Sequence, residues 1–221
     1  MRAPRQPRVK ICCIRSLEEA WMAIEAGAAA LGLVSKMPSG PGVIPEEAIA
    51  RIAARVPPGV ATFLLTSELN VPAIIAQQKR TRVNTLQIVD RLVSGAHHEL
   101  RAALPGIALV QVIHVGGPAS IEEALAVAPH VDALLLDSGN PALPVKELGG
   151  TGRTHDWSIS RRIREAAPVP VFLAGGLNPA NVAEAIRQVE PFGIDLCNGV
   201  RTEGALDAAK LSAFFRAVST T

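Results

Sequence analysis

Short apolar runs alternate with longer, alanine-rich segments of helical pattern about eight times along this chain of 221 residues. Apolar runs of this length, bounded by glycine, proline or charge, are typical of strands buried on both faces of a parallel sheet. The expected strands are residues 9–14, 30–34, 60–65, 85–89, 107–113, 131–136, 169–173 and 193–196. The expected helices are residues 17–26, 45–55, 71–79, 97–103, 120–127, 157–166, 179–189 and 206–218.

Eight such units with no linker and no change of composition favour a closed barrel over an open, doubly wound sheet. The glycine fingerprint GxGxxG, which an open dinucleotide-binding sheet would favour after its first strand, is missing. We therefore predict a single α/β domain, a (β/α)8 TIM barrel with parallel strands, over residues 1–221. Residues 1–7 are expected to be a frayed N-terminus.

Local signals indicate where several helices begin. Ser16 precedes a turn rich in glutamate, which is typical of an N-cap. Pro45 is expected to open the second helix, at a position where its missing N–H costs nothing. Ser120 and Glu123 have the spacing of a capping box, which predicts a helix that starts at Ser120.

Composition excludes several classes of protein. Apolar residues make up 48% and charged residues 19% of the chain, which is ordinary for a globular protein. A net charge of +2 and only 3% aromatic residues argue against a nucleic-acid surface built from basic patches and stacking platforms. The apolar runs are broken well before the ~18 residues of a transmembrane helix. No secretory signal is recognisable, so we expect a cytoplasmic protein without nucleic-acid or membrane partners.

A strand-like run ends on a carboxylate at Asp137 and leads into a long loop rich in glycine. Asp137 would lie at the rim where catalytic groups of barrels collect. The loop contains Gly149, Gly150, Thr151 and Gly152, whose N–H groups are of the kind that line a phosphate. The alternative is that Asp137 only caps a turn and that the glycines only make the loop flexible.

Two further glycine turns follow the seventh and eighth expected strands. The first contains Gly175 and Gly176, and the second contains Asn198 and Gly199. Because the sixth, seventh and eighth strands lie on one side of a barrel, their loops would meet there. The three turns together predict a phosphate site.

Cys12 lies near the end of the first expected strand. Strand alternation predicts that Lys10 and Cys12 face the barrel interior and that Cys13 faces the surrounding helices. An ammonium beside a thiol favours its ionisation, so Cys12 is a candidate base or nucleophile. The alternative is that Cys12 packs as a small apolar residue. Three cysteines, two of them adjacent, form neither a disulfide framework nor a zinc ligand set, and no metal is expected.

In order along the chain, the segments VKICCI, AGAAALGLV, LLLDS, GGTGRTHDW, PVFLAGGLNPANV and FGIDLCNGV resemble the phosphoribosylanthranilate isomerase family. The resemblance covers nearly the whole chain. It implies a (β/α)8 barrel that uses no cofactor and performs an Amadori rearrangement of an N-phosphoribosyl amine in tryptophan biosynthesis. It also implies a phosphorylated sugar-amine as the small-molecule partner, in a monomer or homodimer.

The resemblance assigns roles to individual residues. Matching the family's KICGI motif to KICCI places its general base on Cys12 and leaves Cys13 at the motif's glycine. The family's general acid falls on Asp137, and Asp195 matches an aspartate that precedes the family's Ser-Ser-Gly segment. The family's phosphate contacts fall on the loops that contain Gly150, Thr151, Gly152, Gly175, Gly176, Asn198 and Gly199.

The chain departs from the family pattern at the end of the site that would bind the amine. Pro41 stands where the family has an arginine that helps to hold the anthranilate, and proline cannot replace a guanidinium. The family's QLHG becomes Gln87-Ile88-Val89-Asp90, so a histidine is lost and an acid appears. Further candidate substrate contacts are therefore Lys10, Gln87, Asp90 and Asp195, with Arg15, Lys36, Arg153 and Arg201 as candidate replacement cations.

Three functions are compatible with these residues. The first is isomerisation of phosphoribosylanthranilate, with Asp137 as acid and Cys12 as base. The second is the same reaction with a different amine, because the residues that would recognise the ring differ. The third is a barrel without catalytic activity that binds a sugar phosphate. Such a barrel would need neither an acid nor a base at these positions.

Overall fold

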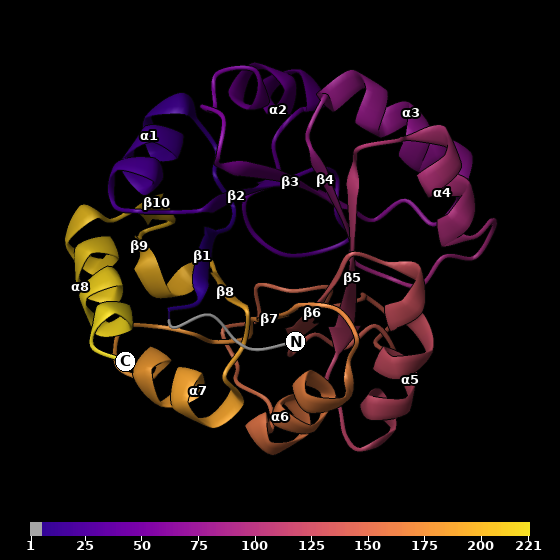
Figure 1. The fold of residues 1–221 in the computed structure, drawn as a ribbon. Helices are drawn as coiled ribbons and strands as arrows, with labels where there is room; N and C mark the ends of the chain where they lie inside the picture. The colour runs from indigo at the N-terminus through magenta and orange to yellow at the C-terminus, as the bar shows by residue number, and fades with distance from the viewer. Residues whose placement is uncertain (1–5) are drawn as a thin grey trace.

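The computed structural model describes residues 6–221, in which eight parallel strands form a closed barrel surrounded by helices (Figure 1). The strands are β1 Arg8–Ile11, β2 Ala30–Val34, β3 Ala61–Thr66, β4 Thr85–Ile88, β5 Ala108–His114, β6 Ala133–Asp137, β7 Val171–Leu173 and β8 Gly193–Leu196. The helices are α1 Leu17–Glu25, α2 Glu46–Ala53, α3 Val71–Thr81, α4 His97–Ala103, α5 Ala119–Val127, α6 Trp157–Ala166, α7 Val182–Val189 and α8 Ala208–Ser219. The predicted (β/α)8 barrel is confirmed.

Some predicted boundaries are wrong. Strand β1 ends at Ile11 rather than at residue 14, because Cys13 takes a left-handed backbone conformation with φ of 62°. Helix α7 begins at Val182, three residues after the predicted proline. The described chain also contains the short helices η1 Ala128–His130 and η2 Asn198–Val200 and the hairpin β9 Arg201–Thr202 with β10 Ala205–Leu206.

The capping box predicted at Ser120 does not form. Helix α5 begins one residue earlier, and its N-cap, Pro118, makes no side-chain cap hydrogen bond. The Ser120 hydroxyl instead accepts from the Gly116 N–H at 3.2 Å and donates to the His114 carbonyl at 3.3 Å. The N-cap predicted at Ser16 does form, because its hydroxyl accepts from the Glu19 N–H at 3.2 Å.

Apolar side chains fill two separate regions on either side of the strands. One region lies between strands and helices and includes Leu134 and Leu136 of β6. The other fills the barrel and includes Leu135 of the same strand, with Phe63 and Phe172 packed edge to face at 5.9 Å. Side chains that alternate along β6 therefore serve opposite faces, as a strand covered on both sides requires.

The barrel closes where β1 pairs with β8. Lys10 and Asp195 are register partners there, and Lys10 Nζ donates to Asp195 Oδ2 at 2.7 Å. Lys10 is fully buried, and its ammonium lies 5.3 Å from the centre of the Phe63 ring. Burial opposes the charge, but the negative charge and hydrogen bond of Asp195 outweigh it and raise the pKa of Lys10. Lys10 therefore faces the interior, as predicted.

Residues 1–5, the greater part of the predicted frayed N-terminus, lie outside the described residues. Pro7 is buried, and the N–H of Arg8 donates to the Phe192 carbonyl at 3.0 Å. Among the described helices, none has the length and apolar character needed to cross a membrane.

Replacing Asp195 with alanine should destabilise the barrel strongly, because the fully buried Lys10 ammonium would lose its partner. Removing one member of a buried ion pair typically costs about 3–5 kcal/mol. The matched control is Glu184→Ala, which breaks an exposed pair with Arg187 and should cost less than ~1 kcal/mol. Urea unfolding measures both. Equal losses for the two variants would show that the Lys10–Asp195 pair does not stabilise the closure.

Candidate active site

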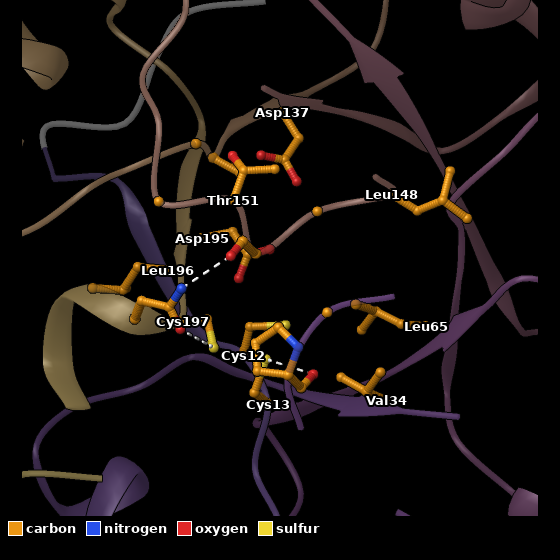
Figure 2. A pocket seen from close by; sticks show the side chains of 18 of the residues that line it. Cys12, Cys13, Val34, Leu65, Asp137, Leu148, Thr151, Asp195, Leu196 and Cys197 are labelled. Atoms are coloured by element: carbon orange, nitrogen blue, oxygen red, sulfur yellow. Dashed lines mark hydrogen bonds between the residues drawn. The ribbon is translucent and has the colours of Figure 1, made fainter. Parts of the chain in front are cut away.

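A pocket of about 270 Å³ opens at the C-terminal ends of the strands, close to the lower end of the range for small-molecule sites. Eleven of the residues predicted for the site line it: Cys12, Gln87, Asp137, Gly150, Thr151, Gly152, Gly175, Gly176, Asp195, Asn198 and Gly199. Figure 2 shows Cys12, Cys13 and Cys197 grouped on one side, with Asp137 on the other. Loops after β1, β2, β6, β7 and β8 thus contribute to one cavity.

The remaining predicted residues do not line the pocket. Lys10 is buried in the barrel, and Lys36 is exposed. Three arginines are held by acids: Arg15 and Arg201 by Glu19, and Arg153 by Glu147. Asp90 pairs with Lys146 at 2.5 Å. Among the described residues that line the pocket, none is a lysine or an arginine.

Asp137 ends β6 with its carboxylate at the pocket wall. Burial raises the pKa of Asp137, against the opposing effects of the Ser138 N–H and the nearby His114. The N–H of Ser138 donates to Oδ1 at 2.7 Å and fixes the direction of the carboxylate. A carboxyl group whose neutral form is favoured in this way is suited to act as a general acid.

The prediction that Cys13 faces the helices is wrong. Both Cys12 and Cys13 line the pocket and pack in one cluster with Cys197 close by. The alternation of side chains holds only for extended residues, and β1 has already ended when the chain reaches Cys13. The Cys13 thiol donates to the Pro41 carbonyl with a sulfur–oxygen distance of 3.6 Å.

The thiols differ in their electrostatic surroundings. Hydrogen bonding with Cys12, then with Cys197, and burial raise the pKa of Cys13 well above its ordinary value. The pKa of Cys197 is lowered by the hydrogen bond with Cys13 and by the charge of Arg201, against burial. Sequence reasoning missed Cys197, although its position at the end of β8 placed it at the rim. Cys197 is therefore a second candidate for a thiolate in this pocket.

Backbone packing against β2 fixes Cys12. A Cβ on Gly32 would lie 2.7 Å from the Cys12 sulfur and 3.0 Å from the Lys10 ammonium nitrogen. Glycine is required at position 32, because the Cys12 thiol and the Lys10 ammonium group both lie against the backbone of β2 there.

Arg201 supports the site from outside the pocket. Its guanidinium donates to the Cys13 carbonyl at 2.6 Å and to the Cys12 carbonyl at 3.3 Å. It also pairs with Glu19 of α1 at 2.8 Å. Arg201 was predicted as a replacement cation for substrate, but the structure uses it to hold the turn that carries both cysteines.

The glycine loops after β6, β7 and β8 contact one another at one end of the pocket. The Asn198 amide donates to the Gly150 carbonyl at 3.0 Å. Gly176 has φ of 62°, and a Cβ there would meet the backbone of Arg153 at 2.7 Å. In the described part of the chain, the N–H groups of Gly152 and Gly176 donate to no acceptor within the protein. These are the free backbone donors that an anion site requires.

The end of the pocket near β2 and β4 is apolar. Its lining side chains are Val34, Met37, Leu65, Val89 and Leu148. Pro41 also lines the pocket but lies against Cys13 and Gly150. Such a surface suits an aromatic ring or another flat apolar group. The pocket therefore has a glycine-rich end with free donors, a middle with thiols and carboxylates, and an apolar end.

His155 is a further residue near the site that sequence reasoning missed. Its Nε2 lies 2.7 Å from the Ser160 hydroxyl, and burial lowers its pKa to about 4. Its Nδ1 lies 3.1 Å from where a Cβ on Gly175 would be. A single histidine in a loop carries no signal that would have revealed this position. Across residues 6–221, no three His, Cys, Asp or Glu side chains are grouped as a metal site would need.

Comparison with known proteins agrees with this geometry. The family model described as N-(5'phosphoribosyl)anthranilate (PRA) isomerase matches residues 9–217. The enzyme named N-(5'-phosphoribosyl)anthranilate isomerase 2 from Methanosarcina mazei is 36% identical, over 94% of this chain and 92% of the relative. The isomerase from Methanocella arvoryzae is 33% identical, over 89% of this chain and 90% of its own.

Solved structures agree as well. Phosphoribosyl anthranilate isomerase from Thermotoga maritima has a TM-score of 0.79 and 30% identity, covering 97% of this chain and 100% of its own. A structure of the isomerase in complex with reduced 1-(o-carboxyphenylamino)-1-deoxyribulose 5-phosphate has a TM-score of 0.76 at 29% identity, with the same coverage. The barrel, its pocket and these relatives together show that the chain belongs to the phosphoribosylanthranilate isomerase family.

Proposed function

We propose that this protein isomerises phosphoribosylanthranilate, the activity that the names of its relatives give for them, and that it does so by an Amadori rearrangement. The observation that carries the proposal is the pocket itself, which combines a buried carboxyl group of raised pKa, a thiol and free backbone donors. A reaction that needs one acid, one base and a phosphate anchor requires these three elements. A barrel that only bound a sugar phosphate would have no use for the first two.

In the proposed mechanism, Asp137 acts first. Its proton passes to the ring oxygen of the ribose, the bond from that oxygen to C1′ breaks, and the nitrogen lone pair forms a protonated Schiff base. Cys12, as thiolate, then removes the proton from C2′ to give the enolamine. Tautomerisation of the enolamine gives the 1-amino-2-ketose. The acid and the base thus act in turn at neighbouring atoms of one substrate.

The glycine loops are assigned to the phosphate. The free N–H groups of Gly152 and Gly176 supply dipoles to the dianion, and η2 contributes Asn198 and Gly199 to the same wall. The phosphate is remote from the carbons that react, so it anchors the substrate rather than taking part in proton transfer.

A second candidate function keeps the reaction and changes the amine. It is favoured by Pro41, which lies in the pocket wall where the family has its arginine, and by the absence of lysine and arginine from the described lining. We infer in addition a single-domain, cytoplasmic protein without a nucleic-acid partner that acts as a monomer or a homodimer. The isomerase from Thermotoga maritima is described as dimeric in the name of a structure of monomers generated from it.

Cys12→Ser and Asp137→Asn should each lower kcat for phosphoribosylanthranilate about 10²–10⁴-fold, because proton transfer by a positioned group contributes about that much. Loss of substrate fluorescence follows the reaction. Cys197→Ser removes the third thiol of the pocket and should retain most of the turnover. If Cys197→Ser is the inactive variant and Cys12→Ser is not, the base is Cys197. If wild type does not convert phosphoribosylanthranilate, the first function is wrong, and a different amine or binding without catalysis remains.

The raised pKa of Asp137 should make the stability of the folded protein depend on pH. A raised pKa adds stability that is fully present below the ordinary aspartate value of ~3.9 and is lost as pH rises through the raised value. Asparagine stays neutral at every pH. Asp137→Asn should therefore have a higher Tm than wild type at pH 8, and the difference should shrink toward pH 4. A difference independent of pH would show that the folded protein does not raise the pKa of Asp137.

Gly152→Ala should raise KM more than it lowers kcat, because a methyl group would occupy space at the proposed phosphate anchor. Gly152 has φ of 70° and no protein atom within 4 Å of a Cβ placed on it. Gly106→Ala is the matched control, since Gly106 has φ of 84°, equal open space and no part in the pocket. Steady-state kinetics and inhibition by inorganic phosphate measure the effect. Equal kinetics for the two variants would remove Gly152 from the anchor.

A further inference from the structure

The apolar end of the pocket lacks the cation that a carboxylated amine would need. Anthranilate carries a carboxylate on its ring, and a carboxylate taken out of water requires a cation or several donors. Pro41 supplies neither, and its carbonyl is already engaged by the Cys13 thiol. Arg15 and Arg201 pair with Glu19 of α1, and Arg153 pairs with Glu147. Lys146 pairs instead with Asp90, which directly follows Val89 of the apolar lining. The question is which other cation reaches this end.

Lys146, in the loop between β6 and α6, lies beside the apolar end and is anchored from two sides. Its Nζ lies 2.5 Å from Oδ2 of Asp90, the residue that follows Val89 of the pocket wall. Its carbonyl accepts from the Ser39 hydroxyl at 2.6 Å, and Ser39 also lines the pocket. Leu148, two residues further on, lies in the lining too. The ammonium group is thus held by a residue next to the pocket lining, and the Lys146 backbone is held by a lining residue.

The ammonium retains capacity for another acceptor. A lysine has three N–H donors, and within the described residues only Asp90 accepts from Lys146. The Asp90 side chain is 9% exposed and that of Lys146 43%, so the lysine side chain is accessible to solvent while its partner is buried. Asp90 is itself fixed, because its Oδ1 accepts from the Arg91 N–H at 2.8 Å. The aspartate thus holds the lysine at the rim.

We propose that Lys146 is the residue that recognises a carboxylate on the amine half of the substrate, with Asp90 as its positioning residue. This inference rests on the proposed function and deepens it by assigning the residue that binds the ring carboxylate of the substrate. The two departures from the family pattern then compensate for each other. Pro41 removes a cation from the loop after β2, and Asp90 recruits another from the loop after β6.

The test compares two substrates that differ only in the carboxylate, phosphoribosylanthranilate and N-(5′-phosphoribosyl)aniline. Lys146→Ala should raise KM for the first about tenfold or more, with a smaller change in kcat, because a charge-assisted hydrogen bond is lost. It should leave KM for the second unchanged. Lys146→Arg should restore most of the affinity for the first. Lys79→Ala, a lysine removed from the last turn of α3, controls for the change in net charge.

Three results would overturn the inference and leave the proposed function in place. One is equal KM for phosphoribosylanthranilate in Lys146→Ala and Lys79→Ala. Another is a loss of affinity in Lys36→Ala instead, which would assign recognition to the exposed lysine of the loop after β2. The third is a wild-type enzyme that uses the substrate without the carboxylate equally well. If wild type converts neither substrate, the proposed function itself is wrong and this inference falls with it.

Discussion

Closure of the barrel between its first and last strands is the constraint on which the site depends. The β1–β8 pairing brings Lys10 opposite Asp195 in register, and the ion pair is buried inside the barrel. A buried pair of this kind is costly to break because either charge left alone would be desolvated. The pairing also brings the ends of β1 and β8 together at the mouth (Figure 1). Cys12 and Cys197 are neighbours in the pocket for this reason.

The turn after β1 is strained, and the surrounding structure holds it in place. Cys13 has a left-handed backbone, which costs a residue with a Cβ about 1–2 kcal/mol relative to glycine. Arg201 donates to the carbonyls of both cysteines and is anchored by Glu19, so the turn is fixed by an ion pair from a remote part of the chain. Strain that persists in this way is common at functional sites. Here its consequence is that three thiols share one side of the pocket.

The pocket is divided along its length by the kind of chemistry its walls offer. Backbone donors lie at the end built from the loops after β6, β7 and β8, where glycine lets the loops approach within contact distance. The carboxyl and thiol groups lie in the middle, and apolar side chains lie near β2 and β4. A substrate with a phosphate at one end and an aromatic ring at the other has a single orientation in such a pocket. This single orientation alone determines which carbon atoms of the substrate lie next to the acid and the base.

The sequence by itself determined the eight βα units, the barrel, and the placement of Asp137 and the glycine loops at one rim. The units follow from the period of apolar residues, which is a local property of the sequence. The common rim follows from barrel topology, because parallel strands end at the same face. The orientation of Cys13 could not be predicted, because alternation fails once a residue leaves the extended conformation. The partners of Arg201 and Lys146 could not be predicted either. A long charged side chain pairs with whatever acid the folded chain brings within reach, and Glu19 and Asp90 are 182 and 56 residues away from them in sequence. Only the tertiary structure decided which acid each of these cations pairs with.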